Sequence, residues 1–213
     1  CRTAFVNLIV DAEHGYGNAL NVMRTNQELQ AAGVSAACVE DSILPRSFRS
    51  TEVQSLVSIE EGCKKMQAAV EARGKHGSML VVARTNAAAS AGAAEAGKRL
   101  KAYQDTGVDA LFLQYIKRRE ELDQVAKELS LPIIMGGAHE SLHDLGYLAD
   151  CGVKVWLWGH QTFAVAVQAL HDAMKDIQDG VFPSQLKNKA PDTRMRLVLD
   201  SDRYDRLTKQ YLE

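Results

Sequence analysis

The feature that most constrains the fold of this chain is a sixfold alternation of short apolar runs with segments of helical periodicity. The apolar runs are rich in Val, Ile, Leu and Ala, and short polar connections separate them from the helical segments. Buried strands that alternate with helices form a parallel sheet, because each helix returns the chain to the start of the next strand. We therefore expect six strands, over residues 5–10, 34–39, 78–83, 109–114, 131–135 and 153–158.

Helical periodicity and capping residues place the intervening helices. Gly33 is a C-cap signal after the first helix, and Ser58 with Glu61 forms a capping box before the second. The segment Ile43 to Val57 shows neither period and is predicted to be a long loop. The expected helices cover residues 19–32, 58–73, 87–104, 117–129, 140–150 and 162–177, with one or two short helices within 195–212.

Polar residues after the strands distinguish a barrel from a doubly wound sheet. A barrel builds one site from many strand ends, whereas a doubly wound sheet concentrates such residues at one switch point. Here acidic residues, arginine, glycine or histidine follow five of the six strands, with Asp11, Glu40, Arg84, Gly136 and His160 as examples. This pattern favours a (β/α)₈ TIM barrel.

Six strands do not close an eight-stranded barrel, and the chain begins with Cys1 rather than Met. We therefore expect that two strands precede this sequence. The predicted organisation is a partial barrel catalytic domain over residues 1–180 and a helical tail over 181–213. The tail is expected to pack on the barrel or on a neighbouring subunit, and the alternative is a frayed terminus.

Charge and cysteine content exclude several classes of protein. The net charge is −2 and no Lys/Arg block is present, so neither nucleic acid nor a membrane is an expected partner. The four cysteines show no C-x-x-C spacing, which argues against a zinc ribbon or a disulfide framework. No apolar stretch is long enough to span a bilayer. We expect a cytoplasmic protein with a small diffusible ligand.

The stretch DAEHGYGN carries the strongest indication of chemistry. Asp11 and Glu13 follow the first strand, and side chains two residues apart in extended chain point the same way. Two such carboxylates can hold a hard divalent cation. Gly15 and Gly17 allow a close approach of the backbone to a ligand, or positive φ. The alternative is a solvated polar turn.

Several motifs together resemble a known family. DAEHGYGNALNVMRT, VED after the second strand, ARTNA after the third and a late Gly-His are similar to the isocitrate lyase/phosphoenolpyruvate mutase superfamily, and most of all to its oxaloacetate decarboxylase branch. The resemblance implies a (β/α)₈ barrel that binds a small α-keto acid on Mg²⁺, with Mn²⁺ as an alternative metal. It also implies a homo-oligomer, a dimer or tetramer in which the C-terminal helix is exchanged between subunits.

The resemblance assigns the metal site. Asp11 resembles the acid that contacts the metal directly, and Glu13 and Glu40 match acids that hold the metal's water molecules. Gly15 and Gly17 fall in the loop beside the metal and are expected to contact substrate. The donors are carboxylates, which suit Mg²⁺ better than zinc.

The resemblance also assigns Arg84 and His160 to catalysis and substrate binding. Arg84 matches the arginine that binds a substrate carboxylate or phosphonate, and its planar guanidinium suits a bidentate clamp. Structural pairing of Arg84 with Glu40 is the alternative. His160 matches the histidine of the decarboxylase branch and is expected to orient the substrate or to deliver a proton. The alternative for His160 is a backbone contact at a helix start.

These features predict Mg²⁺-dependent decarboxylation of oxaloacetate, or of a close α-keto diacid, to pyruvate and CO₂. Lyases of the family carry a K-[KR]-C-G-H motif in the loop after the second strand, where this chain has Pro45-Arg46-Ser47-Phe48-Arg49. The absence of that cysteine disfavours isocitrate and methylisocitrate lyase activity. The alternatives are another lyase or a phosphonopyruvate-acting hydrolase of the superfamily, and a truncated relative without catalytic activity.

Overall fold

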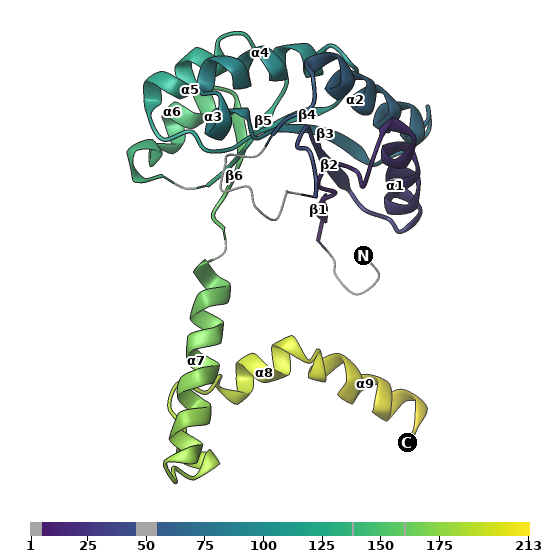
Figure 1. Ribbon diagram of the computed structural model, residues 1–213. Helices are drawn as coiled ribbons and strands as arrows, with labels where there is room; N and C mark the ends of the chain where they lie inside the picture. The colour runs from purple at the N-terminus through teal and green to yellow at the C-terminus, as the bar shows by residue number, and fades with distance from the viewer. Residues whose placement is uncertain (1–5, 46–54, 138, 160) are drawn as a thin grey trace. The chain divides into compact units, whose positions relative to one another are not determined.

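Six parallel strands form one curled sheet in a computed structural model, which describes residues 6–45, 55–137, 139–159 and 161–213. Each strand pairs with the next one along the chain, so the order in the sheet is the order in the sequence (Figure 1). The strands are β1 (Ile9–Asp11), β2 (Ala36–Glu40), β3 (Leu80–Thr85), β4 (Ala110–Leu113), β5 (Ile133–Gly136) and β6 (Val153–Leu157). The prediction of six parallel strands is confirmed.

The helices that follow these strands lie mainly over one face of the sheet (Figure 1). They are α1 (Ala19–Ala31), α2 (Ile59–Arg73), α3 (Ala87–Ser90), α4 (Ala93–Gln104), α5 (Arg119–Ala126), the 3₁₀ turn η1 (Glu140–Leu142) and α6 (Leu145–Asp150). Ser58 Oγ accepts a hydrogen bond from Glu61 N at 3.1 Å, so the predicted cap of α2 is present. Gly33 ends α1 with φ of 80°.

The alternation of side chains along the strands gives the sheet two different faces. The face under the helices carries the main apolar core, to which the strands contribute Val39, Val81, Ala83, Leu111, Leu113, Ile133 and Met135. The opposite face, which we call the inner face, has a smaller buried cluster of Ala36, Cys38, Val82, Ala110, Phe112 and Ile134. Residues in register with this cluster at the strand ends therefore belong to the inner face.

Two predicted helices are each divided in the structure. Residues 87–104 form α3 and α4, because Gly92 takes φ of 86°, which a right-handed helix does not allow. Residues 140–150 form η1 and α6, because Asp144 Oδ1 accepts a hydrogen bond from Tyr147 N at 3.0 Å and starts a new helix. The central part of the predicted loop 43–57 lies outside the described residues.

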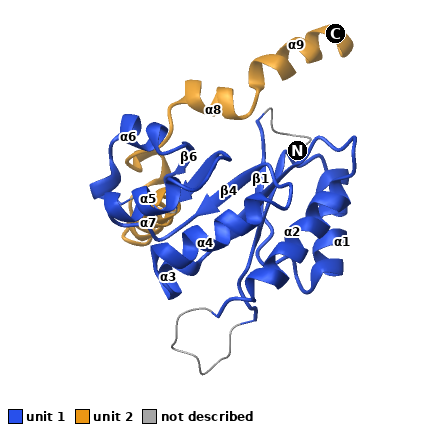
Figure 2. Cartoon of the chain, turned by 90° about the horizontal axis from the view of Figure 1, so that it is seen from above, with its two compact units in different colours: residues 1–159 blue, residues 160–213 orange. Residues whose placement is uncertain are grey.

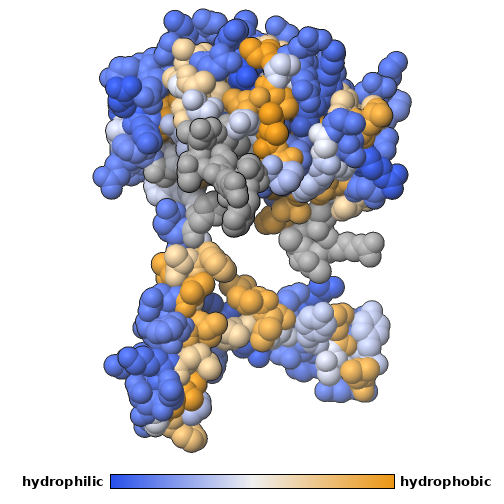
Figure 3. Space-filling view, viewed as in Figure 1, coloured by the Kyte–Doolittle hydropathy of each residue, from blue (hydrophilic) through white to orange (hydrophobic). Residues whose placement is uncertain are grey.

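The chain consists of two compact units, residues 1–159 and 160–213, each defined by the contacts among its own residues (Figure 2). The second unit contains α7 (Gln161–Gln178), the 3₁₀ turn η2 (Pro183–Gln185), α8 (Asp192–Val198) and α9 (Ser201–Tyr211). Arg196 of α8 pairs with Asp205 of α9 at 2.6 Å. None of these helices contains a buried residue, and apolar side chains show on the surface of α7 and α8 (Figure 3).

The division at residue 159 groups α7 with the C-terminal helices, whereas the sequence suggested a boundary at residue 180. Throughout the described parts of the chain, no helix combines the length and apolarity that crossing a membrane requires.

Candidate active site at the carboxyl ends of the strands

Strand register brings three predicted site residues to one edge of the inner face. Glu40 of β2 is the register partner of Arg84 of β3, and Asp11 of β1 is level with Cys38 of β2. Since Cys38 and Glu40 are two residues apart on the same strand, their side chains point to the same face. Asp11, Glu40 and Arg84 therefore meet at the carboxyl ends of adjacent parallel strands.

Arg84 is the centre of this cluster. Its Nη1 donates to Asp11 Oδ2, and its Nη2 lies 2.9 Å from Glu40 Oε2. Nη2 also donates to Gln114 Oε1 at 3.1 Å, while Nε donates to Asn86 Oδ1 at 3.3 Å. The guanidinium carbon lies over the Phe112 ring of β4, 5.3 Å from the ring centre, in a cation–π contact.

These contacts limit what Arg84 can offer to a ligand. A guanidinium has about five N–H groups, and among the described residues three hydrogen bonds and the ion pair of Nη2 with Glu40 engage four of those of Arg84. One N–H on Nη1 remains, which is enough for one hydrogen bond to a carboxylate. The bidentate clamp expected from the sequence requires that Gln114 or another partner first give way.

Electrostatics keep Arg84 charged although it is buried. Burial alone would lower the pKa of its guanidinium, but the carboxylates of Glu40 and Asp11 outweigh this and raise the pKa above its ordinary value. The pairing of Arg84 with Glu40, which the sequence left open as an alternative, is present. It places Arg84 in the cluster of acids and does not remove it from the site.

The carboxylate of Glu40 is almost fully buried, with 1% of the residue exposed. In addition to its ion pair with Arg84, the Glu40 carboxylate accepts a hydrogen bond from Asn86 Nδ2 at 2.8 Å. Cys38, two residues earlier on the same face, is also buried, and burial raises the pKa of its thiol well above the ordinary value. Cys38 is therefore a neutral packing residue and not an activated nucleophile.

Asp11 and Glu13 come together through a turn and not through strand alternation. Asp11 is the last residue of β1, and Glu13 has φ of 49°, so the backbone is no longer extended there. Asp11 Oδ1 accepts a hydrogen bond from Glu13 N at 3.0 Å, and Glu13 O accepts one from Glu40 N at 2.7 Å. The argument from a period of two is wrong at Glu13, but the turn ties this loop to the end of β2.

The donor atoms of the site fit a hard divalent cation. They are carboxylate oxygens, and the Asp11 side chain is 48% exposed. The amide oxygens of Asn86 and Gln114 already accept hydrogen bonds from Arg84. Among the described residues, no three His, Cys, Asp or Glu side chains are grouped closely enough to hold a metal by themselves. Mg²⁺ does not need such a cage, because it usually binds one or two carboxylates and keeps several waters.

Gly15 and Gly17 are explained by the packing of their own loop. A Cβ added to Gly15 would lie 2.4 Å from Val22 Cγ2, and one added to Gly17 would lie 2.4 Å from Asn21 Oδ1. Both partners belong to α1, and Gly15 also has φ of 73°. The glycines thus let the loop fold onto α1, and their contact with substrate stays a prediction.

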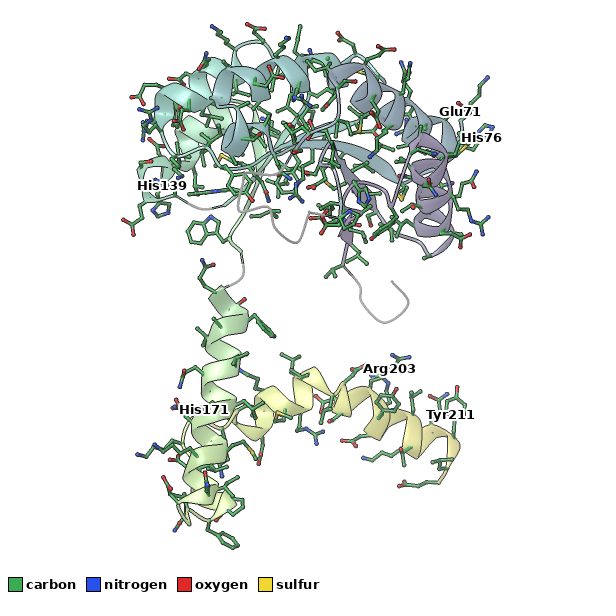
Figure 4. The ribbon with its side chains drawn as sticks, viewed as in Figure 1. Glu71, His76, His139, His171, Arg203 and Tyr211 are labelled. Atoms are coloured by element: carbon green, nitrogen blue, oxygen red, sulfur yellow. The ribbon has the colours of Figure 1, made fainter. Side chains whose placement is uncertain are left out.

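His160 lies outside the described residues, so its role also stays a prediction. Three other described histidines belong to other elements of the chain. His76 follows the end of α2 near Glu71, His139 precedes η1 in the loop after β5, and His171 is on α7 of the second unit (Figure 4).

Two polar contacts of the site were missed by sequence analysis. Asn86 bridges Glu40 and Arg84, and Gln114 accepts from Arg84. Gln114 directly follows β4, the one strand for which no polar residue at the carboxyl end was considered. Asn86 stands two residues after Arg84 in the ARTNA motif, so its position was visible although its contacts were not.

A second buried network supports the site from the helix side of the sheet. Asp41, which follows Glu40, is fully buried and accepts hydrogen bonds from Thr85 Oγ1, Arg99 Nη1 and Tyr103 Oη at 2.8, 3.0 and 2.8 Å. Arg99 Nη1 also donates to Val57 O at 2.9 Å. This network connects α4 to the ends of β2 and β3, from which Glu40 and Arg84 extend.

Comparison with known proteins identifies the family. Residues 1–178 match the sequence model of the protein family that is described as phosphoenolpyruvate phosphomutase. The chain belongs to this family. It is 43% identical to the oxaloacetate decarboxylase of Paraburkholderia xenovorans over 99% of this chain and 70% of that protein. It is 42% identical to the oxaloacetate decarboxylase of a Bradyrhizobium species over 97% of this chain and 71% of that protein.

Solved structures of the family share the fold. A crystal structure of phosphonopyruvate hydrolase in complex with oxalate and Mg²⁺ matches with a TM-score of 0.83 and 26% identity, over all of this chain and 75% of that one. The predicted resemblance to the isocitrate lyase/phosphoenolpyruvate mutase superfamily and its oxaloacetate decarboxylase branch is confirmed. The curled sheet of six parallel strands with its helices is the α/β arrangement that this chain shares with these structures.

Proposed function

We propose that this protein catalyses the Mg²⁺-dependent decarboxylation of oxaloacetate, or of a close α-keto diacid, to pyruvate and CO₂. The observation that carries the proposal is the convergence of Asp11 and Glu40 on Arg84 at the strand ends. This cluster occurs in a chain about 40% identical to proteins named oxaloacetate decarboxylase. Mn²⁺ is the alternative metal.

Each acid has a separate role in the proposal. Asp11, whose side chain is half-exposed, holds the metal directly, and Glu13 and Glu40 hold its water molecules. A bound Mg²⁺ supplies a Lewis acid, which stabilises the negative charge that develops on a keto oxygen as CO₂ leaves. The phosphonopyruvate hydrolase structure with oxalate and Mg²⁺ supports a divalent cation in this family.

Arg84 supplies the positive charge for a substrate carboxylate. Its remaining N–H on Nη1 donates to that carboxylate, and Asp11, Glu40 and Asn86 keep the guanidinium in place. Gly15 and Gly17 provide the loop beside the metal. His160 orients the substrate or delivers the proton that converts the enolate to pyruvate. Decarboxylation needs no cysteine in the loop after β2, which agrees with the sequence there.

The direct test is the formation of pyruvate from oxaloacetate with Mg²⁺ and with a chelator, corrected for decarboxylation by the metal alone. Other α-keto diacids and phosphonopyruvate serve as competing substrates. Arg84→Met is expected to lose most of the enzymatic rate. Arg73→Met is the matched control, because Arg73 pairs with Asp109 at the opposite ends of the strands. A rate no higher than the metal background, or equal losses in both variants, would contradict the proposal.

We also propose a complete (β/α)₈ barrel and an oligomer. The edge strands of the described sheet carry exposed apolar side chains, with Ile9 44% and Leu157 39% exposed, as expected if further strands close it. The exposed apolar residues of α7 to α9 support a dimer or tetramer in which the C-terminal helix is exchanged between subunits. They also support a tail, over residues 181–213, that packs on the barrel or on a neighbouring subunit. Light scattering tests the oligomer against the 23.4 kDa chain. The cytoplasmic location stays a prediction.

A further inference from the structure

We propose that Asn86 is a positioning residue, which holds the Arg84 guanidinium and the Glu40 carboxylate in fixed orientation to each other. The inference deepens the proposed function and rests on it. Asn86 Nδ2 donates to Glu40 Oε2 at 2.8 Å and to Ser42 Oγ at 2.9 Å. Asn86 Oδ1 accepts from Arg84 Nε at 3.3 Å, and only 4% of the residue is exposed.

The side chain of Asn86 does not perform the role that its place in the chain suggests. Asn86 is the residue before α3, where an asparagine normally accepts a hydrogen bond from the first turn of the helix. Its side chain makes no such bond, and Thr85 Oγ1 instead accepts from Ala87 N at 3.1 Å. The amide is therefore committed to Glu40 and Arg84 and not to the helix.

The two neighbours determine which way the amide points. Arg84 has only donors, so it must face the amide oxygen, and the Glu40 carboxylate has only acceptors when ionised, so it must face the amide nitrogen. An amide supplies both functions in one side chain. A carboxylate at this position would lie next to that of Glu40, and a methyl group would supply neither bond.

This contact matters for the geometry in which Arg84 meets a ligand. The bond to Nε fixes the plane of the guanidinium, while Asp11 and Glu40 hold Nη1 and Nη2. The remaining N–H on Nη1 then points in one fixed direction. Without Asn86 the guanidinium can tilt about the pairs that remain, and the hydrogen bond to a ligand carboxylate loses its alignment.

A double-mutant cycle tests the proposal with oxalate as the probe. Oxalate affinity in the presence of Mg²⁺ is measured by calorimetry for the wild type, Asn86→Ala, Arg84→Lys and the double variant, together with kcat and KM for oxaloacetate. Asn86→Ala is expected to weaken oxalate binding by about tenfold to a hundredfold, the range for a hydrogen bond to a charged group. The double variant is expected to bind within about threefold of Arg84→Lys, because Asn86 acts through Arg84.

The control is Asn26→Ala, which removes another buried asparagine, on α1, whose Nδ2 donates to Val22 O at 2.9 Å. It is expected to lower the melting temperature and to leave oxalate affinity within about twofold, since additive effects are usual for distant sites. The proposal would be overturned if Asn86→Ala bound oxalate with wild-type affinity. It would also be overturned if the loss of oxalate affinity in the double variant equalled the product of the losses in the two single variants.

A ligand-independent measurement separates this proposal from the proposed function. The Nε–H signal of Arg84 in a ¹⁵N spectrum is identified by its absence in Arg84→Lys, and Asn86→Ala is expected to displace it. An unchanged signal would overturn the positioning role. If the wild type binds oxalate but does not decarboxylate oxaloacetate, or binds no oxalate, the proposed function fails while this spectrum still decides the role of Asn86.

Discussion

Removal of Arg99 is expected to destabilise the protein strongly. Asp41 is fully buried, and Arg99 is its ion-pair partner at 3.0 Å, with Thr85 and Tyr103 as neutral donors. In Arg99→Ala the charge of Asp41 stays buried without this partner, and the hydrogen bond to Val57 O is lost as well. The two strand ends that carry Glu40 and Arg84 lose a common support on α4.

The size of this effect follows from the burial of the pair. Breaking a buried ion pair by removal of one partner costs about 3–5 kcal/mol. Lys65, another buried cation, interacts electrostatically with Asp41, so we take the lower end, about 3 kcal/mol. In a protein of this size, each kcal/mol shifts the melting temperature by about 2–4 °C. The expected decrease is therefore about 6–12 °C.

The assay is thermal unfolding at one protein concentration, with two further variants. Arg118→Ala breaks an exposed ion pair with Glu121 at 2.7 Å and is expected to change the melting temperature little, because solvent screens exposed charges. The double variant Arg99→Met with Asp41→Asn removes both charges and is expected to recover most of the loss. If Arg99→Ala destabilises the protein no more than Arg118→Ala, or if the double variant recovers nothing, the reasoning is refuted.

Two further predictions concern the folded state. Gly15→Ala should cost about 1–3 kcal/mol more than Gly137→Ala in urea unfolding, because both have positive φ but only Gly15 would bring a Cβ against Val22; equal costs would contradict the packing argument. Burial, with the charge of Asp41, raises the pKa of Tyr103. Above about pH 10 the unfolded chain then loses this proton first, so stability falls as pH rises. Between about pH 8 and pH 10.5, the wild type should lose about 0.8 kcal/mol more than Tyr103→Phe, and equal losses would contradict the assigned environment.

The order of elements could be predicted from sequence because burial and periodicity are local properties. Each β-strand is a short apolar run, and parallel pairing then brings the ends of β2 and β3 together, so Glu40 and Arg84 could be expected at one edge. The division of residues 87–104 was missed because the sequence analysis did not consider Gly92, which precedes α4. Its positive φ is not visible in the periodicity of the apolar residues.

Side-chain partners could not be predicted in the same way. Adjacent residues of one strand face opposite sides, so Glu40 enters the site while Asp41 pairs with α4, although both are acids at one strand end. Asn86 was given no role of its own within the ARTNA motif, and only the three-dimensional structure shows its contact with Arg84. The turn at Glu13 likewise depends on a hydrogen bond to β2, from a segment distant in sequence.

The central claim, that Asp11 holds the metal on which the ligand binds, is tested most directly by oxalate binding with and without Mg²⁺. Asp11→Asn is compared with Asp109→Asn, since each aspartate pairs with an arginine but at opposite ends of the strands. The account predicts that the wild type and Asp109→Asn bind oxalate only with Mg²⁺, and that Asp11→Asn loses this dependence together with most of its affinity. Mg²⁺-dependent binding that survives in Asp11→Asn would contradict it.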